Sequence, residues 1–163
     1  MIRWLGADDL AEWRKIRSDA LRETPSAFLT SLAEFEAQSD EQVRDRLAQG
    51  QVLAVFDGPR VVATTAFSQK TRPQTRHRAE LSAFYVRAEA RGAGVADRLM
   101  ASVVDAASER GVVQLELWVY AGNPRAIAFY RRHGFEQSGV MPRAVVVDGV
   151  DHDDFFMVRA LDR

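Results

Sequence analysis

A glycine-rich turn in the middle of the chain joins two segments of different periodicity. Residues 79–86 (AELSAFYV) alternate throughout with a period of two, as strand residues do. From Val95 onward, apolar residues recur at helical spacing. The turn between them, 91–94 (RGAG), is mostly small residues, so backbone N–H groups stay open to a ligand at the positive end of the helix dipole. This arrangement favours a phosphate or pyrophosphate as the ligand.

The turn fits neither of two better-known phosphate loops. The dinucleotide fingerprint needs a third glycine three positions after the second, and Asp97 stands there. A P-loop needs Gly-Lys followed by Ser or Thr, and no lysine is near. Because glycines in turns often serve only to reverse the chain, the turn alone leaves a purely structural role open.

A second pattern follows in residues 123–133, which the Asn-Pro start and the glycine after them predict to be a helix. Asn123 and Tyr130 are seven positions apart, so they lie two turns along one face. An amide and a phenol in line could line one groove. The alternatives are that Asn123 only caps the helix and that Tyr130 is a core residue.

The elements around these patterns predict a mixed α/β fold. The segment 112–120 reads as a strand that returns after a helix from 79–86, and such a crossover makes the two strands parallel. Turn signals predict hairpins at Asp57-Gly58 and at Asp148-Gly149. The other expected elements are a strand at 1–5, helices at 10–21, 26–38 and 40–49, and hairpin strands at 51–56, 61–68, 144–147 and 150–160. We therefore expect a single domain over 1–163.

The amino-acid composition argues against several classes of function. The formal net charge is −1, which argues against nucleic acid or a membrane surface as the partner, and we expect the basic segment 69–78 to be solvated. The chain has no cysteine and three scattered histidines, so we expect no metal. No apolar run reaches membrane-spanning length and the start lacks an apolar signal core, so we expect a soluble, cytoplasmic protein.

Two stretches, YVRAEARGAGVADRLM and AGNPRAIAFYRRHGFEQSG, together resemble the acyl-CoA-binding core of the GNAT superfamily of N-acetyltransferases. The resemblance covers residues 79–139. The family's loop pattern, Gln/Arg-x-x-Gly-x-Gly/Ala, is matched by Arg91, Gly94 and Ala96; in the frame of Gly92 and Gly94, Glu89 occupies the first position. The Asn-x-x-Ala-x-x-x-Tyr spacing and the His-Gly-Phe that follows match the second motif.

The resemblance implies acetyl-CoA as cosubstrate and a GNAT-like mixed sheet. The sheet would have about six or seven strands, mostly antiparallel with one central parallel pair, and helices on both faces. Tyr85 and Val86 would hydrogen-bond the pantetheine arm, and Asn123 would bind it or the region next to the thioester. Tyr130 would protonate the departing thiolate. The pyrophosphate would be held by Arg91, Gly92, Ala93, Gly94, Val95 and Ala96.

Transfer to an amine also needs a base, because an alkylammonium is almost wholly protonated at neutral pH. Glu80 is the first candidate, on the strand face that the alternation gives to Val86; related enzymes often place a glutamate there. The alternative is that Glu80 pairs with Arg76 or Arg78. Further carboxylates that could attract a cationic acceptor are Glu34, Glu36, Asp151, Asp153 and Asp154.

The acceptor is less constrained. By the resemblance, residues 22–36 and 142–154 would frame it, with Phe28, Phe35 and Met141 as an apolar wall or as ordinary packing. A small-molecule amine and a protein N-terminus both remain open as acceptors, as do a monomer and a homodimer. We expect an N-acetyltransferase; the alternative is a CoA-binding regulatory module without acceptor chemistry.

Overall fold

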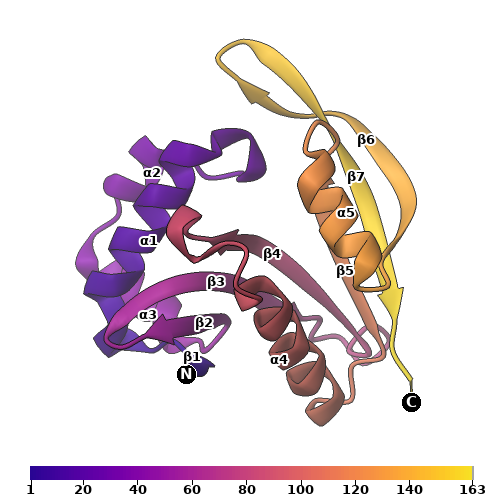
Figure 1. Cartoon of the computed structure of the whole chain (residues 1–163), viewed down its shortest axis with the longest axis horizontal. Coiled ribbons are helices and arrows are strands. Elements are labelled where there is room, and N and C mark those ends of the chain that lie inside the picture. Colours follow the sequence, from indigo (N-terminus) through magenta and orange to yellow (C-terminus); the bar gives the residue numbers. More distant parts are fainter. Residues whose placement is uncertain (163) are drawn as a thin grey trace. The chain divides into compact units, whose positions relative to one another are not determined.

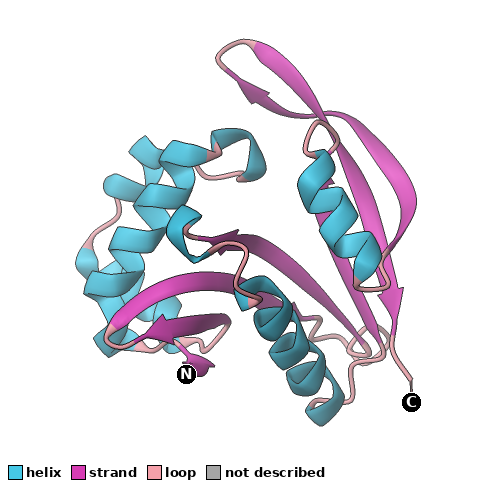
Figure 2. Ribbon diagram, viewed as in Figure 1, coloured by secondary structure: helices cyan, strands magenta, loops and turns pink. Residues whose placement is uncertain are grey.

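The computed structural model describes residues 1–162 (Figures 1 and 2). Within them the strands form a seven-stranded mixed sheet in the order β1-β2-β3-β4-β5-β7-β6, with helices flanking the strands. The strands are β1 (Ile2–Trp4), β2 (Val52–Asp57), β3 (Arg60–Gln69), β4 (Arg78–Val86), β5 (Gln114–Tyr120), β6 (Glu136–Val147) and β7 (Val150–Ala160). The helices are α1 (Leu10–Glu23), α2 (Leu32–Glu36), α3 (Asp40–Ala48), α4 (Val95–Glu109) and α5 (Pro124–Arg132), with 3-10 turns η1 (Ala7–Asp9), η2 (Pro25–Ala27) and η3 (Ala88–Ala90). The predicted fold class is confirmed.

The chain forms two compact units. The first comprises residues 1–67 and 83–103, and the second comprises residues 68–82 and the chain from Val104 onward. The expectation of one domain stays a prediction.

The first unit is built on the apolar face of α1. Trp13 and Ile16 of this helix are buried with Phe35 of α2 and Leu47 of α3, as the helical spacing predicts. The predicted hairpin forms between β2 and β3, which are antiparallel. Close packing of these side chains fixes α1 within its unit.

The second unit contains the predicted parallel pair. Residues 78–81 of β4 pair in parallel with 114–117 of β5, and β5 pairs antiparallel with β7. Odd-numbered residues such as Leu117 and Met157 are fully buried, and α5, whose Ile127 is buried, lies over these strands (Figure 1). Even-numbered residues of β5 and β7 share the other face.

Two predicted element boundaries are wrong. The helix expected over 26–38 is interrupted, because Phe28 is extended and Ser31 caps a new helix by accepting a hydrogen bond from the Glu34 N–H. The first strand of the last hairpin begins at Glu136 rather than at 144, since its residues pair with β7 from there.

The uninterrupted alternation expected for 79–86 is also wrong. Ala83 has a φ of 52°, in the left-handed region that costs a non-glycine residue about 1–2 kcal/mol. A residue in this conformation breaks the regular pleat of β4. Counting by two across Ala83 therefore no longer places Glu80 on the face of Val86, and their shared face stays a prediction.

None of the helices within residues 1–162 combines the length and the apolar character that a membrane crossing requires.

Candidate functional site

The loop between β4 and α4 has the open backbone that its sequence predicts. Gly92 and Gly94 have φ values of 80° and 75°, which L side chains rarely adopt. A Cβ at either glycine would meet nothing within 4 Å, so the glycines serve the backbone conformation and leave free space over the loop. Residues 92–94 are exposed, and α4 starts directly after them at Val95. The N–H groups of this first turn have no partner within the helix, which suits an anion.

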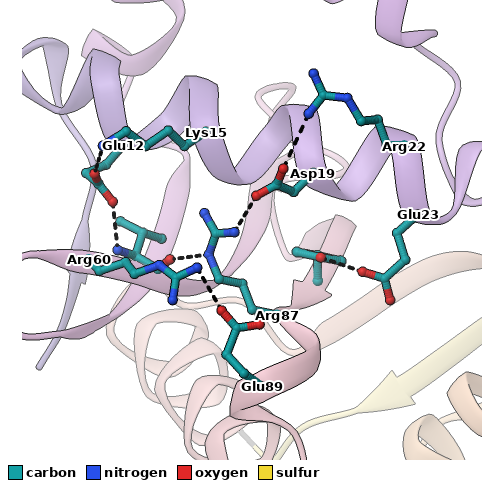
Figure 3. Close-up of polar contacts among 10 residues, drawn as sticks. Glu12, Lys15, Asp19, Arg22, Glu23, Arg60, Arg87 and Glu89 are labelled. Carbon is teal, nitrogen blue, oxygen red and sulfur yellow. Dashed lines mark hydrogen bonds and ion pairs between the residues drawn. The ribbon is translucent and has the colours of Figure 1, made fainter.

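Two ion pairs from α1 hold the segment that precedes this loop, and Figure 3 shows the one between Asp19 and Arg87. Asp19 pairs with Arg87, and Glu23 pairs with Arg91. The two carboxylates are four positions apart on α1, so they lie on one helix face. The two arginines are also four positions apart and stand on either side of η3. We call these four residues the α1 clamp.

Further contacts fix the same segment to β3. The Arg87 side chain is only 6% exposed, and its Nε donates to the Val61 carbonyl at 2.9 Å. The Arg87 backbone N–H donates to the Val62 carbonyl, and Arg60 pairs with Glu89 of η3 at 2.7 Å. Since a buried guanidinium without partners is very costly, these contacts specify the position of Arg87 strongly.

The side chain of Arg91, the last arginine of the clamp, contacts two groups within this unit, and its expected place at the pyrophosphate stays a prediction. The Arg91 Nε donates to the Val86 carbonyl at 3.0 Å, and its guanidinium also bonds to Glu23. Its side chain therefore stabilises the end of β4. Glu89, the acidic residue of the other motif frame, is likewise occupied by Arg60.

Tyr85 joins this network through its hydroxyl, which donates to Glu23 at 2.6 Å. That hydrogen bond, followed by those from Arg91, lowers the pKa of Glu23. Burial, together with the nearby Glu23 charge, raises the pKa of Tyr85. Tyr85 is thus a neutral donor at physiological pH.

A shallow depression of about 420 Å³ lies beside the clamp, between α1, Arg60 and Arg87. It is lined by several cations, but these are neutralised by partners, as in the pairs of Lys15 with Glu12 and Arg22 with Asp19. We therefore read it as part of an ion-pair network (Figure 3).

In the second unit, α5 carries both residues of the second motif. The Asn123 Oδ1 accepts from the Ala126 N–H at 3.1 Å, so the capping role that the sequence left open is present. Tyr130 is buried, with its ring edge-on to Phe129 and Phe135. Burial raises the pKa of Tyr130, so its phenol keeps its proton.

The candidate base lies on β4 next to a second glutamate. Glu80 pairs with Lys70 at 3.2 Å, not with Arg76 or Arg78 as the sequence suggested. Its register partner Glu116 is buried and accepts two hydrogen bonds of 2.8 Å from Arg78. Sequence reasoning missed Glu116, and the only local signal was a glutamate in an otherwise apolar strand. Of the two, Glu80 has the more accessible carboxylate, with 35% of its side chain exposed.

Several other predicted residues are engaged elsewhere. Phe28 and Phe35 belong to the core of the first unit, which supports the packing alternative for both. Glu34 completes the cap of α2 by accepting from the Ser31 N–H. Asp151 pairs with Arg143 at 3.2 Å. Within residues 1–162, no group of three or more histidine, aspartate or glutamate side chains could hold a metal ion.

The fold and these motifs define an acetyltransferase of the GNAT class. The sequence model of the Acetyltransferase (GNAT) family matches residues 11–135, and the chain belongs to this family. The match includes the loop, the α1 clamp and α5.

Curated relatives carry N-acetyltransferase names. The L-methionine sulfoximine/L-methionine sulfone acetyltransferase of Pseudomonas aeruginosa is 30% identical, over 99% of this chain and 94% of that protein. The L-amino acid N-acetyltransferase of Escherichia coli is 29% identical, over 73% of each chain. A match to an N-acetyltransferase of Methanocaldococcus jannaschii covers only 42% of this chain and 30% of that longer protein.

Solved structures give the same fold. A ribosomal-protein-alanine N-acetyltransferase from Brucella melitensis is 29% identical, with a TM-score of 0.79 and 99% of both chains covered. An acetyltransferase from Salmonella typhimurium, solved with its cofactor acetyl-CoA, is 22% identical with a TM-score of 0.82. That match covers 100% of this chain and 94% of the other.

Because of the α1 clamp, we expect the free energy of unfolding to depend on pH. Because the pKa of Glu23 is lowered in the folded state, its contribution is present above the unfolded value of about 4.3 and is lost as pH falls through the folded value. Glu23→Gln is expected to lower the free energy of unfolding by about 1 kcal/mol at pH 7, a charged hydrogen bond reduced by solvent screening. The difference from the parent should shrink at pH 3, as measured by urea unfolding.

Glu36→Gln is the matched control, since Glu36 makes only an exposed pair with Arg22 at 3.5 Å. It should change stability by less than half as much as Glu23→Gln. Equal losses in both variants at pH 7 would remove the special role of the clamp.

Proposed function

We propose that this protein transfers an acetyl group from acetyl-CoA directly to a primary amine. The observation that carries the proposal is the exposed, left-handed backbone at Gly92 and Gly94, placed at the start of α4 within the family match. The structure from Salmonella typhimurium supports acetyl-CoA as the ligand of this fold. Residues 91–96 would hold the pyrophosphate through the N–H groups that follow Arg91, whose own N–H donates to the Ala88 carbonyl.

The α1 clamp would give this loop its binding conformation before the ligand arrives. Ordering a flexible loop on binding costs affinity, and a loop held in place avoids much of that cost. Arg91 would then act through its contact with Val86 and its backbone rather than as a free cation on the phosphates. Tyr85 and Val86 would present the end of β4 to the pantetheine arm, and the expected binding of the arm by Asn123 stays a prediction.

The chemistry would use one base and one acid. Glu80 would accept the proton of the acceptor ammonium, directly or through water, and the free amine would attack the thioester carbonyl. A C–N bond forms and the C–S bond breaks. The attacking nitrogen would then lose its second proton to solvent, and Glu80 would release its own proton there. Tyr130 would give its proton to the departing thiolate and regain one from solvent. Because burial raises the pKa of Tyr130, the phenol is still protonated when the sulfur leaves.

The acceptor would be the amine of a small molecule or of a protein N-terminus. The names of the Escherichia coli and Pseudomonas aeruginosa relatives favour amino acids and related small molecules. The name of the Brucella melitensis protein favours an N-terminus.

The first test is whether acetyl-CoA binds and an amine releases its thiol. Saturating acetyl-CoA, at about 100 times its Kd, should stabilise the fold by about 2.7 kcal/mol and raise the melting temperature. A library of primary amines should then include members that release free CoA, followed with a thiol reagent. Binding without release from any amine would favour the regulatory module, and no melting shift would exclude both.

The loop itself is tested by a pair of glycine variants. Gly94→Ala and Gly58→Ala both place a side chain at positive φ, 75° and 56°, where a Cβ meets nothing within 4 Å. Each should cost about 1 kcal/mol of stability. Only Gly94→Ala should also weaken acetyl-CoA binding, by at least tenfold in calorimetry, because it changes the loop over which the phosphates would lie. An equal affinity in the two variants would contradict the assignment of the loop.

Tyr130→Phe tests the proposed role of Tyr130 as the proton donor to the thiolate. Removing the phenol should lower kcat by about 100-fold, the lower end of general acid catalysis, with the KM for acetyl-CoA changed less than twofold. Melting temperature without ligand checks that the buried ring is still accommodated. An unchanged kcat in the folded variant would exclude Tyr130 as the proton donor.

A further inference from the structure

Aromatic side chains form a row on the even-numbered face of β5 and β7. Trp118 lies opposite Phe156 in register, with ring centroids 4.8 Å apart. Trp118 is 43% exposed, although it stands in the middle of its strand. One step along the same face, Tyr120 contacts His152 edge-on, also at 4.8 Å. Large exposed aromatic groups of this kind mark binding surfaces more often than packing.

A partly buried carboxylate, Asp154, lies within this row. Asp154 is the register partner of both Tyr120 on β5 and Met141 on β6, so its neighbours across the sheet are an aromatic ring and a thioether. Among residues 1–162 it forms no ion pair. Burial, and then the charge of Asp153, raise the pKa of Asp154, and the charge of His152 opposes this rise.

Several other carboxylates of this unit have cations of their own. Glu80 and Glu116 share the cations Lys70 and Arg78, and Asp151 has an arginine on its own hairpin. Asp154 forms no such pair among residues 1–162, so its partly buried carboxylate is available to an external cation.

The side of Phe156 away from Trp118 is also open. Its register partner on β6 is Gly139, which contributes no side chain. A Cβ there would only reach ordinary contact with the Phe156 Cβ, at 3.9 Å. A flat or apolar group could thus lie along Trp118 and Phe156 while a cation reaches Asp154.

We propose that Asp154, Trp118 and Phe156 form the acceptor-binding wall of this enzyme and select a primary amine that carries an aromatic or large apolar substituent. The proposal rests on the acetyl transfer proposed above. Asp154 would accept hydrogen bonds from the acceptor ammonium, and the rings would bury its substituent. The adjacent ring faces add cation–π attraction.

The wall carries one carboxylate, which complements the charge of an amine, and its small area favours a small amine over a protein surface. A stable protein interface needs on the order of 1,000 Å², whereas this wall consists of one carboxylate and a few ring faces. A protein could still offer the same chemistry through its N-terminal amine and first side chain, and the experiment separates these two sources.

The experiment compares amines that differ only in the substituent. With acetyl-CoA, 2-phenylethylamine should have a kcat/KM at least tenfold above that of ethylamine. L-Phenylalaninamide represents a protein N-terminus, and its rate relative to 2-phenylethylamine shows which source is preferred. Trp118→Ala should reduce the preference for the aromatic amine to less than threefold, and Trp118→Phe should retain most of it.

Asp154→Asn tests whether the negative charge of Asp154 binds the acceptor ammonium. It should raise the KM for both 2-phenylethylamine and ethylamine about tenfold, with the KM for acetyl-CoA changed less than twofold, because one charged hydrogen bond is lost. Asp105→Asn is the matched control, since it makes the same charge change at an exposed position of α4, outside the segments that would frame the acceptor. This control should leave the KM values for the two amines and for acetyl-CoA unchanged.

The outcomes separate the two proposals. If other amines release CoA but the aromatic amine is no better than ethylamine, or if Asp154→Asn leaves the amine KM unchanged, the wall is wrong and acetyl transfer stands. A change of oligomeric state in Trp118→Ala, measured by light scattering, with unchanged amine kinetics would assign the face to a second copy instead. If no amine releases CoA, the proposed function itself fails.

Discussion

The pairing of Asp19 and Glu23 with Arg87 and Arg91 is the constraint on which the candidate loop depends. A loop that offers its N–H groups to a ligand cannot use them to hold its own conformation. Here the conformation is held from outside, by side chains of α1 and by the β3 carbonyl that Arg87 reaches. Only 6% of the Arg87 side chain is exposed, so removing its partners would leave a buried charge, and the Arg87 contacts are a firm anchor.

In the second unit, one face of the strands contributes to stability and the other face to the proposed recognition of the acceptor. The odd-numbered side of β5 and β7 includes the fully buried Leu117 and Met157. The even-numbered side carries the paired Glu80 and Glu116 and then the aromatic row with Asp154. Because successive side chains of a strand point to opposite faces, one short strand can serve both purposes.

The sequence predicted those parts of the candidate site that depend on local chemistry. The glycines of the loop need left-handed backbone, and an Asn-Pro pair starts a helix whatever surrounds it. Both features are present at the predicted positions. The element boundaries that failed lie where a competing local signal decided the outcome, as with the capping box at Ser31.

By itself, the sequence determined the fold class, the parallel crossover, the glycine loop and the helix that carries Tyr130, because periodicity, turns and caps act over a few residues. Only the tertiary structure decided that Asp19 and Glu23 hold arginines 68 positions away, that Lys70 rather than Arg78 pairs with Glu80, and that Asp154 forms no ion pair among residues 1–162. Charged side chains have many candidate partners along a chain. Which of them meet depends on the packing of distant segments, and no local pattern records it.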